Sequence, residues 1–224
     1  MLKIQDIAGG IRCIGLDRAA KRNAIGVEMT LALEQVLVDT THDARVQVVV
    51  FHGIGGHFSA GMDMKDFFDA SVRPANELRR ARAATEHWRT RLLRDLPQTL
   101  ISAVQGYCLG GALPILAWSD VVLAGGDTRF GLPEINFGFV PGGQIIKAVG
   151  TVMARRALAY AALTGRPFDA QQGKRCGLVT EVVDGDPLPH ALALASKLVA
   201  SAAASGTYAA SRCFNHPDPK ESAP

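Results

Sequence analysis

Two apolar runs without polar alternation constrain the fold of this chain most strongly. Residues 46–54 read "VQVVVFHGI" and residues 99–106 read "TLISAVQG", and both are rich in β-branched and other apolar side chains. A strand with one face in water alternates apolar and polar residues, whereas a continuous apolar run fits a strand buried on both faces. Such strands are typical of parallel sheets covered by helices. The sequence therefore predicts an α/β fold.

Segments with helical spacing separate and follow these strands. We expect helices over residues 27–43, 77–96, 145–165, 169–177 and 189–204, and further strands over 11–16, 120–126 and 178–183. Glycines cluster at the junctions between the ends of strands and the following helices, which is where open α/β folds bind ligands. The 224 residues suit one large domain. We expect a core over residues 1–185, a C-terminal helical segment over 186–214 and a disordered tail over 215–224.

Charge and cysteine content exclude several classes of protein. The 24 basic and 21 acidic residues give a net charge of +3, which is too balanced to indicate a nucleic-acid partner. The four cysteines form no CxxC pair, so we expect reduced thiols and no metal site. We find no signal peptide and no apolar run long enough to cross a membrane, so a cytoplasmic protein without a membrane partner is predicted.

The helix expected over residues 77–96 is strongly basic. Its arginines fit either a solvated helix face or a surface that attracts phosphates. The residues concerned are Arg79, Arg80, Arg82, Arg89, Arg91 and Arg94.

Two glycine turns could form one site. In "HFSAGMD", residues 57–63, Gly61 permits a sharp turn before a helix that begins near Met62. In "GYCLGGALP", residues 106–114, two glycines again separate a buried strand from a helix, and Pro114 is tolerable there only in a first helical turn. Backbone N–H groups at such helix starts have no partner within the helix. Two of them together would hold an oxygen that gains negative charge, although tight packing alone could also explain the glycines.

A third segment carries an isolated carboxylate. Glu134 lies in "FGLPEINFG", residues 130–138, and is the only charged residue between Arg129 and Lys147. Burial among apolar neighbours raises the pKa of a carboxyl group, which suits it to take and return protons near neutral pH. A surface carboxylate or a helix cap is the alternative interpretation.

The three segments in this order and spacing resemble the crotonase superfamily, also called the enoyl-CoA hydratase/isomerase family. In detail, "AGMDMKDFF", "GYCLGG" and "EINFGFVPGG" are most similar to the hydroxycinnamoyl-CoA (feruloyl-CoA) hydratase-lyase branch. This resemblance implies a ClpP/crotonase-like spiral of ββα units, here with a truncated helical C-terminus. It also implies a homotrimer or hexamer that binds an acyl-CoA thioester, with coenzyme A as part of the substrate and no separate cofactor.

The resemblance also assigns residues. The backbone N–H groups of Met62 and Gly111 would hold the thioester oxygen, and Glu134 would be the catalytic acid/base. Other positions would contact the coenzyme A portion or line the acyl pocket: Lys21, Ala60, Asp63, Met64, Pro133 and Phe137.

Two positions depart from the family's patterns. Pro114 stands where the main hydratases carry a first glutamate and the hydratase-lyases a serine, and Phe67 stands where the latter carry a tyrosine. We therefore expect an acyl-CoA enzyme with one glutamate, acting by hydration and retro-aldol cleavage of a hydroxycinnamoyl-CoA. The alternatives are a Δ3,Δ2-enoyl-CoA isomerase and a non-catalytic relative that binds acyl-CoA.

Overall fold

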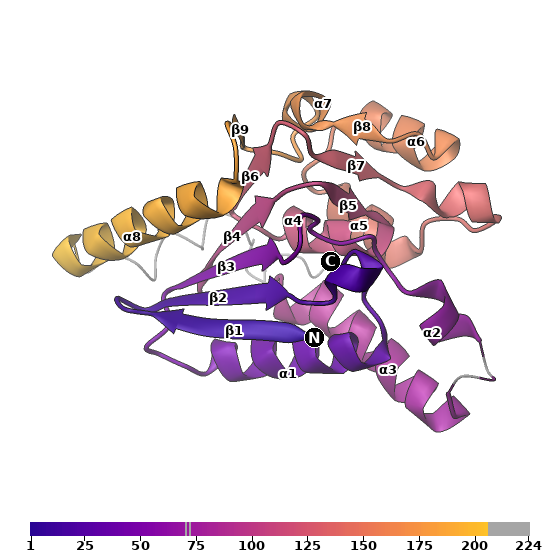
Figure 1. Cartoon of the computed structure of the whole chain (residues 1–224), viewed down its shortest axis with the longest axis horizontal. Coiled ribbons are helices and arrows are strands. Elements are labelled where there is room, and N and C mark those ends of the chain that lie inside the picture. The colour runs from indigo at the N-terminus through magenta and orange to yellow at the C-terminus, as the bar shows by residue number, and fades with distance from the viewer. Residues whose placement is uncertain (70, 72, 206–224) are drawn as a thin grey trace, which may run out of the picture.

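A six-stranded, mostly parallel sheet forms the centre of the molecule (Figure 1). The structure is a computed structural model and describes residues 1–69, 71 and 73–205. The strands lie in the order β1 (Leu2–Ile7), β2 (Ile11–Leu16), β3 (Val48–Gly53), β4 (Thr99–Val104), β6 (Val121–Gly125) and β9 (Glu181–Val183). Only β1 among them runs antiparallel to its neighbour. The parallel α/β sheet predicted from the apolar runs is thus confirmed.

A second, small sheet stands beside the end of the first. It contains β5 (Tyr107–Leu109), β7 (Arg129–Gly131) and β8 (Phe168–Asp169). Consecutive strands alternate between the sheets, because β4 and β6 belong to the large one whereas β5 and β7 belong to the small one. A helix follows each pair: α4 (Leu113–Ala117) after β5, and α5 (Gly143–Val149) after β7. This repetition is the ββα unit expected of the spiral.

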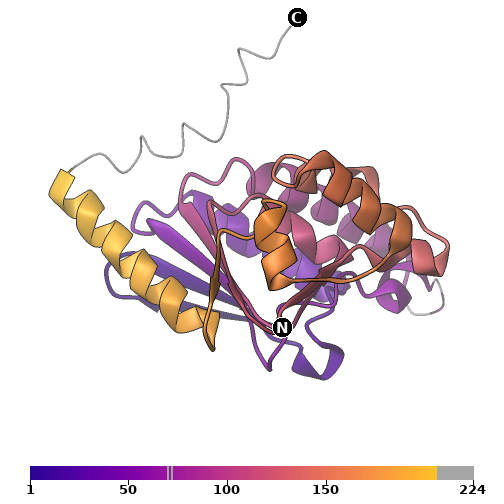
Figure 2. The ribbon, with the colours of Figure 1, turned by 90° about the horizontal axis from the view of Figure 1, so that it is seen from above.

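Both faces of the large sheet are buried, by different partners. Val48 and Val50 face α8 (Pro187–Ser205), whereas Val49 and Phe51 face the main core. Figure 2 shows α8 alone along one face, with α1 (Val27–Thr41) and the other helices beyond the opposite face. Neighbouring side chains of a strand point to opposite faces. The edge strand β1 is largely exposed, whereas a central strand such as β3 needs apolar residues at nearly every position. This explains the absence of alternation in residues 46–54.

Two of the helices expected from the sequence have other boundaries in the structure. The basic segment forms α3 (Ala75–His87), which continues into a π-helical turn over Trp88–Leu92. The helix expected over 145–165 is two helices, α5 and α6 (Arg155–Thr164). Helix α5 ends before Gly150, and the N–H of Ala154, just before α6, donates to the carbonyl of Cys176 at 2.8 Å, just after α7 (Ala170–Arg175).

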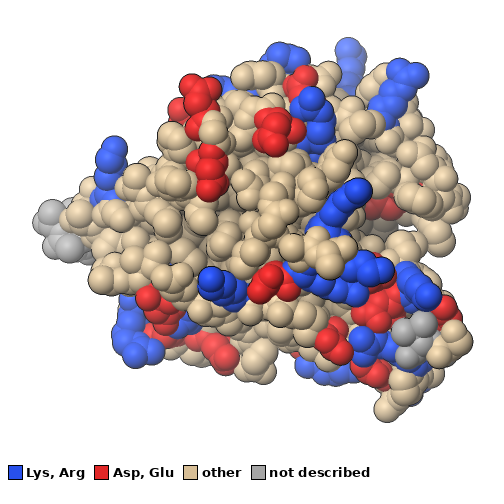
Figure 3. All heavy atoms as spheres, viewed as in Figure 1, with Lys and Arg blue, Asp and Glu red and all other residues tan. Residues whose placement is uncertain are grey.

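Charged side chains of both signs are interspersed on the face shown in Figure 3. Beside α3 they are paired, since Arg80 contacts Glu34 at 2.5 Å and Arg73 contacts Asp66 at 2.6 Å. Asp66 belongs to α2 (Met64–Phe68), which precedes α3. The first pair joins α3 to α1, and the second joins the segment before α3 to α2.

The C-terminal predictions are only partly covered by the described residues. Helix α8 occupies most of the helical segment predicted over 186–214, whereas Cys213 and the tail predicted over 215–224 lie outside the described residues. The proposed division at residue 185 remains a prediction. Among the described residues, no helix combines the length and apolar character that crossing a membrane requires.

Candidate active site

The two glycine turns lie directly against each other. The N–H of Ser59 donates to the carbonyl of Tyr107 at 2.8 Å, and the N–H of Leu109 donates to the carbonyl of Ser59 at 3.0 Å. At Gly61, φ is +88°, and a Cβ added there would lie 2.6 Å from the carbonyl oxygen of Leu109 and 3.4 Å from the nitrogen of Gly111. Only glycine permits this approach together with this backbone conformation.

Each turn leads into a helix, as predicted. Asp63 caps α2, since its side chain accepts a hydrogen bond from the N–H of Asp66 at 3.2 Å. The other turn begins with Gly110 at φ +49° and passes through a 3-10 turn (Gly110–Ala112) into α4. Pro114 occupies the first turn of α4, where its missing N–H removes no helical hydrogen bond.

The two turns present free backbone donors. The N–H groups on either side of Met62 are used, because Gly61 donates to the hydroxyl of Ser59 at 3.1 Å and Asp63 donates to the carbonyl of Ile25 at 3.0 Å. No described residue accepts a hydrogen bond from the N–H of Met62 or of Gly111. Two such donors at helix starts can bind an oxygen that carries negative charge.

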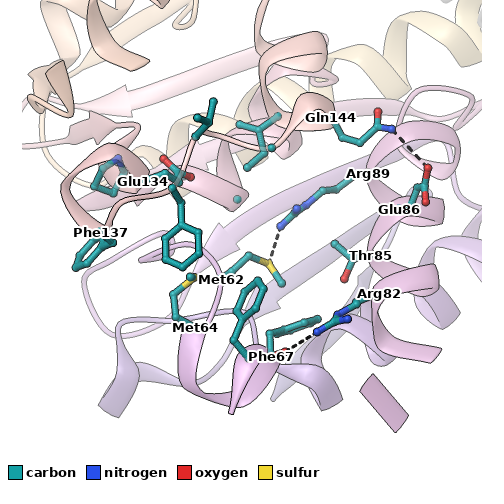
Figure 4. Close-up of a pocket in the computed structure, with 18 of the residues that line it drawn as sticks. Met62, Met64, Phe67, Arg82, Thr85, Glu86, Arg89, Glu134, Phe137 and Gln144 are labelled. Atoms are coloured by element: carbon teal, nitrogen blue, oxygen red, sulfur yellow. Dashed lines mark hydrogen bonds between the residues drawn. The ribbon is translucent and has the colours of Figure 1, made fainter. Parts of the chain in front are cut away.

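Met62 and Gly111 both line a pocket of about 660 Å³ (Figure 4). Its walls come from the two turns, α2, α3, the π-helical turn and the segment after β7. Most of them are apolar: Phe67, Phe68, Phe137, Phe139, Val140 and Ile145. A pocket of this size, apolar with a few polar groups, is typical of sites for small ligands.

Glu134 is the carboxylate that lies against the second glycine turn. It is the second residue of a 3-10 helix (Pro133–Phe137) that ends at Gly138, where φ is +76°. A Cβ at Gly110 would be 2.5 Å from Oε1 of Glu134, so the lack of a side chain at Gly110 makes room for the carboxylate. Oε2 is buried and has no hydrogen-bond partner among the described residues. Burial raises the pKa of Glu134, and the positive charge of Arg89 opposes that rise.

Arg89 is a functional candidate that differs from the rest of the basic stripe. The other five arginines are exposed, and Arg82 among them also lines the pocket, whereas Arg89 is only 7% exposed and lines the pocket from the interior side of the segment. For Arg89, the solvated helix face, one of the two interpretations of the stripe, is therefore wrong. The π-helical turn explains this, because it lets two consecutive residues, Trp88 and Arg89, both point inward. Burial lowers the pKa of Arg89 to about 10, and the nearby negative charge of Glu134 acts in the opposite direction.

The remaining predicted residues divide into two groups. Those that line the pocket beside Met62, Gly111 and Glu134 are Ala60, Met64, Pro133 and Phe137. The other two lie elsewhere. Lys21 ends a short 3-10 turn on the surface, and the carboxylate of Asp63 is paired with Arg18 at 2.8 Å. The roles of Lys21 and Asp63 toward coenzyme A remain predictions.

Comparisons with known proteins agree with the fold and the predicted family. The family model described as Enoyl-CoA hydratase/isomerase matches residues 6–217. The hydroxycinnamoyl-CoA hydratase-lyase of Pseudomonas fluorescens is 32% identical over 179 residues, which cover 80% of this chain and 65% of that protein. The 2,3-dehydroadipyl-CoA hydratase of Escherichia coli is 35% identical over 189 residues, covering 82% of this chain and 70% of that protein.

Solved structures show the same architecture. An enoyl-CoA hydratase from Shewanella pealeana superposes with a TM-score of 0.82 at 26% identity, covering 95% of this chain and 78% of that one. An enoyl-CoA hydratase/isomerase from Marinobacter aquaeolei gives a TM-score of 0.85 at 24% identity, with 98% and 84% covered. The predicted fold class and the resemblance stated from the sequence are thus confirmed, although the chain spans only 65% of the length of the hydratase-lyase.

Proposed function

The chain belongs to the enoyl-CoA hydratase/isomerase family, and on that basis we propose that it is an enzyme that converts acyl-CoA thioesters through an enolate. One observation carries the proposal. Two backbone N–H groups that have no acceptor in the part of the chain that the structure describes, at Met62 and Gly111, belong to the same pocket as Glu134, whose carboxylate lies against the adjoining Gly110.

In the proposed reaction, the thioester oxygen accepts hydrogen bonds from both N–H groups. Negative charge develops on this oxygen as the enolate forms, so the two donors stabilise the transition state more than the ground state. Removing one donor of this kind costs about 10²–10³ in kcat in characterised enzymes. Glu134 takes a proton from one position of the substrate, or from a water that attacks it, and returns it to another carbon. Its raised pKa favours both halves of this exchange.

For the reaction class, we propose hydration followed by retro-aldol cleavage of a hydroxycinnamoyl-CoA. In the cleavage half, loss of the β-hydroxyl proton breaks the bond between the α and β carbons and releases an aldehyde, while the electron pair passes to the thioester enolate. The motif resemblance and the similarity to the hydroxycinnamoyl-CoA hydratase-lyase support this assignment.

A Δ3,Δ2-enoyl-CoA isomerase is the second candidate. Helix α4 reads "LPILA" and supplies no titratable side chain where main hydratases carry their first glutamate. One carboxylate is sufficient for an isomerase, because the proton removed from one carbon is the proton delivered to another. A hydratase with Glu134 alone must hold its water with other groups.

We also propose that the chain assembles into a homotrimer or hexamer in the cytoplasm and uses no cofactor beyond the coenzyme A of its substrate. Large apolar side chains on the surface near the pocket support self-association: Phe137, Phe139, Val140, Tyr160 and Leu163. Cys13, Cys108 and Cys176 are free thiols, which supports a reducing compartment.

The substitution Glu134→Gln tests the proposal. It keeps the size of the side chain and removes its ability to exchange a proton, so we expect turnover to fall by about 10²–10⁴-fold. Crotonyl-CoA, a 3-enoyl-CoA and feruloyl-CoA serve as substrates, read by absorbance and product mass. The matched control is Glu181→Gln, an exposed carboxylate on β9. Unchanged turnover in Glu134→Gln would refute the role of Glu134. Calorimetric binding of thioesters without any turnover by the unmodified protein would favour a non-catalytic relative.

A further inference from the structure

The guanidinium of Arg89 is a buried charge without an ion-pair partner among the described residues, although the charge of Glu134 acts on it from a greater distance. Within residues 1–69, 71 and 73–205, no carboxylate oxygen lies within 4.0 Å of it. Its side chain makes one described hydrogen bond, to the sulfur of Met62, and its Nε has no partner. A thioether sulfur is a weak acceptor, whereas a guanidinium offers five N–H donors. Buried charges in proteins are normally paired, because desolvation costs several kcal/mol per ion.

The surroundings hold this cation in place. The guanidinium lies 5.0 Å from the ring of Trp88, and the carbonyl of Arg89 accepts a hydrogen bond from the indole of Trp118 at 2.7 Å. The side chain is thus oriented before any ligand arrives, which reduces the conformational entropy that is lost on binding. An arginine fixed in this way, with free donors, is suited to bind a planar anion.

The position of Arg89 indicates which part of a substrate it meets. A Cβ at Gly111 would lie 2.4 Å from Nη2 of Arg89, so the guanidinium is packed on the same residue whose N–H we assign to the thioester oxygen. In Figure 4, Arg89 and Glu134 project into the pocket from different elements, and they form no ion pair with each other. A group in contact with Arg89 therefore belongs to the acyl moiety, because the phosphates of coenzyme A are separated from the thioester by the whole pantetheine arm.

We propose that Arg89 is a specificity-determining residue that binds a carboxylate carried by the acyl group, so that the preferred substrates are CoA thioesters of short dicarboxylic enoic acids. A carboxylate matches the planar, bidentate geometry of a guanidinium and supplies the ion-pair partner that Arg89 lacks. The pocket that Arg89 lines is mainly apolar and includes Phe67 and Ile145, which suits the intervening carbon chain. This inference rests on the enolate chemistry proposed above. For the acyl group it is an alternative to the hydroxycinnamoyl moiety, which carries no carboxylate.

Matched thioesters test it. Crotonyl-, pentenoyl- and hexenoyl-CoA each have a counterpart in which a carboxylate replaces the terminal methyl group. In the unmodified protein we expect kcat/KM to be at least about 10-fold higher for one or more of the carboxylated members. In Arg89→Met we expect that advantage to fall by about 10²-fold, mainly through KM, while the neutral members change by less than about threefold. Arg89→Lys keeps the charge without the planar fork and should retain part of the preference.

Arg91→Met is the control, since Arg91 is exposed on the same turn. Equal losses for carboxylated and neutral thioesters in Arg89→Met would overturn the proposal and assign Arg89 to the reaction itself. Thermal melting of each variant separates these results from misfolding. If Arg89→Met does not fold, the unmodified protein decides, because equal kcat/KM for both members of every pair also overturns the proposal.

A failure of the proposed function can be distinguished from a failure of the proposal for Arg89. If no thioester is turned over, calorimetry with the same pairs measures the preference directly. Tighter binding of the carboxylated member that is lost in Arg89→Met and partly retained in Arg89→Lys would support the role of Arg89 while refuting catalysis, whereas equal binding would refute both.

Discussion

The contact between the two glycine turns gives a quantitative prediction for Gly61→Ala. The new methyl group would lie 2.6 Å from the carbonyl oxygen of Leu109, whereas carbon and oxygen of this kind approach to about 3.3 Å. The backbone must therefore open by about 0.7 Å, the difference between these two distances. That displacement separates the N–H of Met62 from the N–H of Gly111. Misplacements of this order cost about 10²-fold in rate, and we expect a loss of that size in kcat with crotonyl-CoA.

The backbone conformation itself also has a cost, which a second glycine isolates. At Gly56, φ is +87°, almost the same as at Gly61, but a Cβ added there would meet no atom within 4 Å. Both alanine variants should lose about 1–2 kcal/mol of unfolding free energy from the left-handed conformation. Only Gly61→Ala should lose activity as well.

The assay combines two measurements on the same preparations. The absorbance of the conjugated thioester follows hydration of crotonyl-CoA, and thermal melting follows stability. A folded Gly61→Ala protein with the kcat of Gly56→Ala would refute the reasoning, because it would show that the spacing of the two donors does not determine the rate.

Two further predictions concern proton binding and helix capping. The positive charge of Arg89 opposes the rise that burial causes in the pKa of Glu134. Arg89→Met should therefore raise that pKa and move the acid limb of kcat/KM to higher pH. A pH–rate profile for crotonyl-CoA that coincides with that of Arg91→Met would contradict this. Asp169 and Gln172 form a capping box at the start of α7, with the N–H of Gln172 donating to Asp169 at 2.7 Å. Asp169→Ala should lower the unfolding free energy by about 1 kcal/mol, or a few degrees in Tm, whereas Asp169→Asn should not. Equal melting temperatures of the two variants would exclude a contribution from the cap.

Local chemistry made the backbone part of the site predictable from sequence. A glycine next to a helix start indicates a turn that other residues cannot adopt, and Pro114 indicated a first helical turn. Glu134 could be selected because its segment contains no other charged residue. Each of these inferences depends on a few neighbouring residues, and the structure brings all three segments to one pocket.

Arg89 was missed because the arginines of the basic segment were interpreted together, as one surface. Arg89 stands eight residues after Ala81 and four before Leu93, both of which are buried, so it lies on the apolar side of the segment. Applying the same spacing to the apolar residues would have set it apart from the other arginines. The start of α6 was missed for another reason. The N–H of Ala154 just before it donates to the carbonyl of Cys176, which is distant in sequence, and no local pattern reveals this contact.

Because the two proposed donors are main-chain N–H groups, substitutions at their positions and substitutions in the pocket wall have different consequences. A point mutation that exchanges the side chain of Met62 leaves its N–H in place, and the donor at Gly111 is protected in the same way unless a larger side chain displaces the turn. Wall residues such as Phe67, Thr85 and Arg89 carry no such constraint. Under the proposed function, a lineage with this site can acquire a new acyl preference by single substitutions in the wall, while the main-chain donors assigned to the thioester oxygen stay in place at every step.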